Sequence, residues 1–192
     1  MLNRILLVFA SLGMAFVMSN AQAEKIKGWA EVKFFGASTL HDFEGAVRSR
    51  VFEVEVEGDQ VDATDLKGVE ITVPVKKMDT GNRRMNKNMH KMFEADKHPT
   101  ITAKLTGISE KTDGSEGGKD VANIQFDIKI REVSKQLRAV VKNIKTSNQE
   151  VMFNLELDVS VKAFKLKPPT MLGVLRVGDN VRVEVEIVLK KR

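Results

Sequence analysis

The sequence of 192 residues contains no cysteine. It can therefore form no disulfide bond, and it offers neither a cysteine nucleophile nor thiolate ligands for a zinc site. It also lacks the cysteine that would carry the lipid of a bacterial lipoprotein. These absences exclude the small disulfide-stapled proteins, so a hydrophobic core must stabilise the fold.

Long hydrophobic runs are absent as well, except for one near the N-terminus. After Arg4, the residues from Ile5 to Met18 are almost all apolar, and Ala21-Gln22-Ala23 has the small-x-small pattern of a cleavage site. The run is too short for a membrane-spanning helix, which needs about 20 apolar residues. We therefore predict a signal peptide over residues 1–23, and a periplasmic, soluble protein without a stable membrane anchor.

The sequence has only three histidines and lacks the common signatures of catalytic and metal sites. It contains no His-Glu-x-x-His segment, no paired Cys/His spacing and no Gly-x-Ser-x-Gly elbow. The glycine-rich segment at 113–118 is not followed by Lys-Ser/Thr, so it does not predict a phosphate-binding loop. We predict no catalytic residue, no metal site and no cofactor.

The tightest polar cluster is His41-Asp42-Phe43-Glu44. On an extended strand Asp42 and Glu44 share one face, whereas His41 and Phe43 share the other. The polar groups could converge on a metal or a substrate only at a turn. A structural role at a strand corner is favoured, and an acid–base site formed by His41, Asp42 and Glu44 remains the alternative.

The charge is weakly basic, with 31 Lys and Arg against 26 Asp and Glu, or +5 at neutral pH. The lysines alternate with glutamates along the chain, and no basic block is interleaved with aromatic residues. The terminal Lys190-Lys191-Arg192 is typical of a solvated end. We predict no nucleic-acid partner.

Most of the chain alternates apolar and polar residues. Phe52, Val54 and Val56 alternate with glutamates, which places the apolar side chains on one face of a strand. Similar patterns recur in segments 69–75, 101–106, 124–130, 137–142, 153–162 and 181–189, and segment 25–37 is an apolar-rich strand with an imperfect period. About eight such strands with one helix predict an all-β fold, an antiparallel β-barrel in a single domain over residues 24–192. A barrel of this size can hold one small ligand.

The exception is a predicted helix near residues 82–95. Asp79 or Thr80 is expected to cap it, and it must end before Pro99. Its apolar stripe, spaced for one helical face, comprises Met85, Met89, Met92 and Phe93. The stripe is interpreted either as core packing or as a flexible surface for an apolar ligand.

The residues expected to line an interior cavity are apolar side chains of the strands and of the helix. They are Trp29, Phe34, Met85, Met89, Met92, Phe93, Phe126, Ile128, Phe153, Leu155 and Leu157.

Two segments resemble motifs of the YceI-like family. They are Ser38-Thr39-Leu40-His41-Asp42-Phe43-Glu44-Gly45, and Met78-Asp79-Thr80-Gly81-Asn82 followed by Met92-Phe93-Glu94-Ala95 and His98-Pro99-Thr100-Ile101. The resemblance implies an exported, lipocalin-like barrel that carries a long apolar molecule. Polyisoprenoids, isoprenoid quinone relatives and fatty-acid derivatives are the ligand classes that it implies. The segment 162–169 departs from the Arg-x-Asp-Phe-Gly-like pattern found before the last strand in many relatives.

The leading hypothesis is thus a non-catalytic, lipid-binding carrier. Two alternatives are an enzyme that acts on a hydrophobic substrate and a stress-related interaction protein whose barrel is packed solid. A homodimer formed through an edge strand or a barrel face is compatible with each of them.

Overall fold

The computed structural model describes residues 24–39, 41–56, 66, 68–112, 121–147, 149–168 and 177–190. The predicted signal peptide, residues 1–23, and the glycine-rich segment 113–118 lie outside these ranges. No helix within them is long and apolar enough to cross a bilayer.

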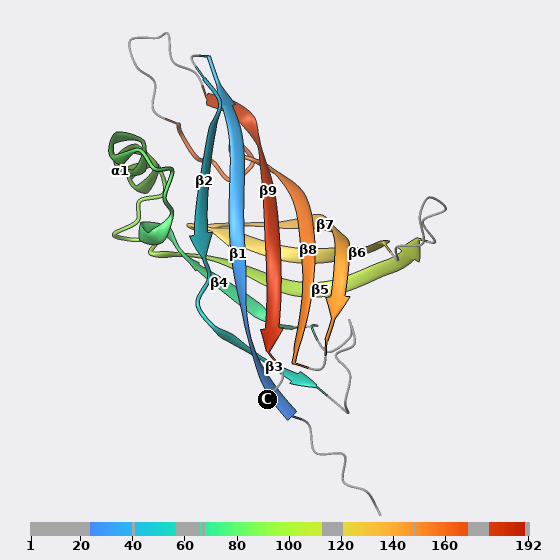
Figure 1. Ribbon diagram of the computed structural model, residues 1–192. Helices are drawn as coiled ribbons and strands as arrows, with labels where there is room; N and C mark the ends of the chain where they lie inside the picture. The colour runs from blue at the N-terminus through green and yellow to red at the C-terminus, as the bar shows by residue number, and fades with distance from the viewer. Residues whose placement is uncertain are drawn as a thin grey trace, which may run out of the picture.

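The described residues form one antiparallel sheet that curls into a nearly closed barrel (Figure 1). Its strands are β1 (Glu24–Ser38), β2 (Phe43–Arg48), β3 (Phe52–Val56), β4 (Glu70–Pro74), β5 (Thr100–Thr112), β6 (Val121–Ile130), β7 (Val133–Thr146), β8 (Glu150–Ser160) and β9 (Val177–Lys190). The order is β2-β1-β9-β8-β7-β6-β5-β4, and β3 also pairs with β1. The predicted all-β, lipocalin-like fold is confirmed.

Strands β2 and β3 act as two halves of one interrupted strand beside β1. Between them, the backbone N–H of Ser49 donates to the carbonyl of Ala30 at 2.8 Å, and the N–H of Ala30 donates to the Ser49 hydroxyl at 2.8 Å. The serine side chain thus replaces a backbone acceptor where the pairing is interrupted. Nine strands of the described residues therefore occupy eight positions around the barrel, and the one that the sequence analysis did not predict is β2.

The barrel closes along a seam between β2 and the chain around β4. Ala46 and Asp79 exchange backbone hydrogen bonds of 2.8 and 2.9 Å, and the N–H of Arg50 donates to the carbonyl of Thr72 at 2.8 Å. A Cβ atom on Gly45 would lie 2.2 Å from the Phe34 ring and 2.8 Å from the carbonyl oxygen of Asp79. The close approach at the seam therefore requires glycine at this position.

Burial along the strands follows the alternation in the sequence. In β3 the side chains of Phe52, Val54 and Val56 are buried, whereas the intervening glutamates are exposed. Pro74 ends β4, which pairs only with β5 and so forms one edge of the sheet. Proline is tolerated at this position because it has no backbone N–H to donate to a second neighbouring strand.

The single α-helix of the described residues, α1 (Arg83–Met92), follows a short 3-10 turn, η2 (Val75–Lys77). The prediction that Asp79 or Thr80 caps it is wrong. Asn82 is the N-cap, and its side-chain oxygen accepts from the N–H groups of Arg84 and Met85, both at 3.0 Å. A cap must directly precede the first helical residue to reach these groups.

Asp79 and Thr80 instead hold the turn before the helix. The Asp79 carboxylate accepts from the N–H of Gly81 at 2.8 Å and from the Asn86 amide at 2.6 Å. The Thr80 hydroxyl and N–H both donate to the Asn86 carbonyl, at 2.7 and 2.9 Å. Gly81 has φ 69°, a left-handed conformation that favours glycine. This network fixes α1 relative to the seam.

Candidate functional site

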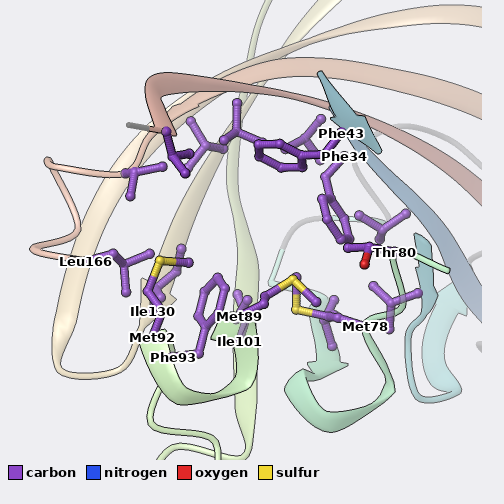
Figure 2. A pocket seen from close by; sticks show the side chains of 18 of the residues that line it. Phe34, Phe43, Met78, Thr80, Met89, Met92, Phe93, Ile101, Ile130 and Leu166 are labelled. Atoms are coloured by element: carbon purple, nitrogen blue, oxygen red, sulfur yellow. The ribbon is translucent and has the colours of Figure 1, made fainter. Parts of the chain in front are cut away.

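A cavity of about 500 Å³ occupies one end of the barrel (Figure 2). Apolar side chains of β1, β2, β4, β5, β6, β8 and β9 form its wall, and α1 covers one side. Figure 2 shows Phe34 and Phe43 across the space from Met92 and Phe93. The barrel is therefore not packed solid, which contradicts the premise of the interaction-protein alternative.

Most of the candidate residues predicted from the sequence surround this cavity. Those that line it are Phe34, Met85, Met89, Met92, Phe93, Phe126, Ile128, Leu155 and Leu157. They come from four separate parts of the chain, β1, α1 with its C-cap Phe93, β6 and β8, so the fold brings together side chains that the sequence separates. Their contact with a ligand remains a prediction.

The expectation that Trp29 faces the interior is wrong. Ala30 and Phe34 of β1 are buried inside, and Trp29 lies on the opposite face of the same strand. There the Arg48 guanidinium and the Lys190 ammonium lie over its ring, each 5.5 Å from the ring centroid. These cation–π contacts and the alkyl stems of the basic side chains cover the ring on the outer surface.

Phe153 faces inward, but it does not line the cavity. It is buried beyond the closed end, beside a second void of about 20 Å³. Alternation along β8 predicts its face correctly, although it gives no information about depth along the barrel.

Sequence reasoning missed several wall residues. Phe43 of β2 and the row Val181, Val183 and Val185 of β9 all line the cavity. The β9 row was visible as an apolar face, so alternation could have identified it. Leu166 also lines the cavity, but it follows a turn after β8 where no periodic pattern applies.

The three methionines of α1 have different environments. Met89 is buried, Met85 and Met92 are half-buried, and all three border the cavity. Their side chains thus pack against the barrel, as the core-packing interpretation expects. They also form part of the cavity wall, as the ligand-surface interpretation expects. Thioether side chains adapt readily to irregular apolar partners.

Polar residues also line the cavity. They are Ser38, His41, Thr80, Asn82, Arg84 and Asn88, of which His41, Asn82 and Arg84 are exposed and so mark its open end. Nearby, hydrogen bonds from the Asn86 side chain and from the Gly81 N–H hold the pKa of Asp79 below its usual range. The cavity therefore has an apolar interior and a hydrogen-bonding rim, an arrangement that suits a molecule with a long apolar chain and a polar end.

The polar cluster of the β1–β2 corner does not converge. His41 borders the cavity, whereas Asp42 and Glu44 are exposed and contribute nothing to its lining. Glu44 pairs with Phe35 on the outer side of β1. No three His, Asp or Glu side chains lie within metal-binding reach of one another in the described ranges. The acid–base alternative therefore has no geometric support at these residues.

Comparisons with known proteins agree with this architecture. The family model for the YceI-like domain matches residues 20–189. The structure of BcnA from Burkholderia cenocepacia is similar with a TM-score of 0.63 and 17% identity, covering 83% of this chain and 95% of that one. No curated protein matches at a significant level.

Two further solved structures share the fold. A polyisoprenoid binding domain from Saccharophagus degradans, implicated in plant cell wall breakdown, has a TM-score of 0.60 and 11% identity, covering 86% of this chain and 98% of that one. A YCEI protein from Campylobacter jejuni has a TM-score of 0.52 and 16% identity, covering 66% and 73%. At these identities the likeness concerns the fold alone.

Proposed function

Because this chain belongs to the YceI-like family, we propose that it is a periplasmic carrier of a long apolar molecule, without catalytic activity. The apolar chain would occupy the barrel cavity, and the polar end would remain at the rim. The ligand classes in question are polyisoprenoids, isoprenoid quinone relatives and fatty-acid derivatives. The similar domain from Saccharophagus degradans, described as polyisoprenoid binding, supports an isoprenoid as the first candidate.

One observation carries this proposal, the apolar cavity of about 500 Å³. Its volume falls within the range of roughly 300–1,000 Å³ that is usual for ligand pockets. Burial of apolar area contributes about 25 cal/mol per Å², from which the entropic cost of association must be subtracted. A flexible chain that fills the cavity would therefore bind through its length, with few directional contacts.

Export would follow from the signal peptide predicted over residues 1–23. The separated polar groups of the β1–β2 corner and the absence of a catalytic signature in the sequence support a role in binding. A homodimer formed through an edge strand or a barrel face remains a prediction.

The proposal predicts that the protein carries lipid when it is purified without detergent. The protein would be expressed from its full sequence in a Gram-negative host and recovered from the osmotic-shock fraction. The recovered protein should begin at Glu24. Organic extraction followed by mass spectrometry should release an isoprenoid or acyl compound in roughly equimolar amount. An empty extract, together with no binding of prenyl or acyl probes by the purified protein, would contradict the carrier function.

Combined replacement of Met85, Met89 and Met92 by alanine should weaken ligand binding as well as stability. Because these side chains pack on the barrel, the free energy of unfolding should fall by about 2–5 kcal/mol. Because they also border the cavity, the affinity for a prenyl probe should fall by roughly tenfold. Urea denaturation and probe titration measure the two effects. Retained affinity would mean that the methionines only seal the core.

The matched control for this variant lies on the same helix. Arg83, Lys87 and Lys91 are exposed. Their combined replacement by alanine leaves the apolar face of α1 intact. This control should change neither the affinity nor, by more than about 1 kcal/mol, the stability.

A further inference from the structure

Three side chains lie at the closed end of the cavity. Ile71 of β4, Phe126 of β6 and Leu155 of β8 line the cavity on one side and the smaller void of about 20 Å³ on the other. All three are buried. They therefore separate the open compartment of the barrel from its packed end.

The same order of side chains is found along each of these strands. On each strand, the inward residue two positions closer to the open end lines only the cavity. The inward residue two positions in the opposite direction lines only the void. The triplets are Val73 and Ile71 in β4 with Val69 just before it, Ile128, Phe126 and Ile124 in β6, and Leu157, Leu155 and Phe153 in β8. Inward residues two apart are about 7 Å apart along a strand. Ile71, Phe126 and Leu155 thus form one layer across the barrel, here named the floor.

Below the floor the interior is filled. Leu105, Ile124, Phe153 and Ile187 are all buried around the small void. A space of about 20 Å³ is close to the size of one water molecule and cannot hold a chain segment. The cavity is therefore blind, and an apolar chain that enters from the polar rim has a fixed depth available.

We propose that the floor sets the longest apolar chain that the cavity accommodates. This inference rests on the proposed carrier function. Each carbon above the floor adds buried apolar area and therefore affinity. Once the chain end touches Phe126 and Leu155, additional carbons must fold back or remain outside the rim, where they add little. Affinity should thus rise with chain length and then reach a plateau.

The test uses geraniol, farnesol and geranylgeraniol, which lengthen by one isoprene unit at each step, and saturated fatty acids of increasing length. Affinities would be measured with the delipidated full-length protein. Phe126→Ala and the milder Phe126→Leu connect the cavity with the space below. Each should move the plateau to a longer chain, and the first probe beyond the wild-type plateau should gain roughly tenfold in affinity from about two further buried methylene groups.

A second variant shortens the cavity without removing a core side chain. Ala103 lines the cavity and pairs directly with Ile71 of the floor. Ala103→Leu should therefore move the plateau to a shorter chain. This opposite shift keeps the inference testable if Phe126→Ala does not fold.

Phe153→Ala is the matched control, because it removes the same atoms as Phe126→Ala just below the floor. It should leave the plateau unchanged. If Phe126→Leu and Ala103→Leu both keep the wild-type plateau, or if Phe153→Ala moves it as far as Phe126→Ala does, the floor does not set chain length, although the carrier function stands. If the wild-type protein binds no probe of any length, both proposals are wrong.

Discussion

Replacement of Leu157 by aspartate is expected to lower the affinity for an apolar ligand by at least about hundredfold, or roughly 2.7 kcal/mol. Leu157 borders the cavity between Leu155 and Val159 of the same strand. A carboxylate at this point would project among apolar side chains, away from the polar groups of the rim. A bound chain would have to strip water from this charge without providing a hydrogen-bond partner.

The effect should be specific to the inner face of β8. Asn154 lies on the other face of this strand and contributes nothing to the cavity lining. Asn154→Asp makes the same change in net charge and should leave the affinity within about twofold of wild type. Probe titration measures both variants. Wild-type affinity in Leu157→Asp would mean that the ligand does not occupy the barrel.

The pH dependence of Leu157→Asp provides a second measurement. An apolar surrounding disfavours the charged carboxylate and raises its pKa above the usual value of about 3.9. Lowering the pH converts this group to the neutral acid, which is less costly to bury. Part of the lost affinity should therefore return at acidic pH, whereas Asn154→Asp should show no such recovery.

Replacement of Phe164 by alanine should cause the largest loss of stability, about 3–5 kcal/mol in the free energy of unfolding. The Phe164 side chain is only 1% exposed and is the largest of the nearly fully buried side chains in the described ranges. It belongs to the turn that follows β8. Removing the ring leaves a void that the surrounding chain must either tolerate or fill.

Collapse into that void is restricted because the turn is held at several points. The carboxylate of Asp179 accepts from the Lys162 N–H at 2.8 Å and from the Ser160 hydroxyl at 3.0 Å, and the Asp179 carbonyl accepts from the Val161 N–H at 2.8 Å. The bond from Lys162 is the main cause that lowers the pKa of Asp179. The carboxylate therefore stays charged at neutral pH and keeps the turn closed.

Urea denaturation of Phe164→Ala measures the loss. Ile144→Ala is the control, because Ile144 is 54% exposed and its truncation should cost less than about 0.5 kcal/mol. A loss below about 1 kcal/mol for Phe164→Ala would show that the turn can repack around the missing ring.

The fold could be predicted from the sequence because the alternation of apolar and polar residues within a strand shows which face is buried. The alternation of Phe52, Val54 and Val56 with glutamates specifies a half-buried strand without reference to the rest of the chain. The sequence of β1 leads to a wrong orientation for Trp29 because this strand carries large apolar residues on both faces. Basic side chains from neighbouring strands cover Trp29, and such partners are not visible in a local pattern.

The cavity could be predicted only in part, because alternation gives the face of a residue and not its depth. Phe153 and Leu157 have the same periodic signal, yet one lies below the floor and the other above it. Their heights depend on the register between strands. Similarly, Asp79, Thr80 and Asn82 are all suitable caps by residue type, and only the position of the first helical turn selects Asn82.

The barrel wall is held together more weakly along the seam than between its other neighbouring strands. In the part of the chain that the structure describes, three backbone hydrogen bonds join β2 and its extension to the chain around β4, whereas β8 and β9 are paired over eleven residues. Local opening is cheapest where the fewest cooperative bonds break. Outward strain on the barrel wall would therefore first break the hydrogen bonds of Ala46, Arg50 and Asp79, while the continuous ladders stay paired. The cross-section of the interior can widen along one line without loss of the sheet.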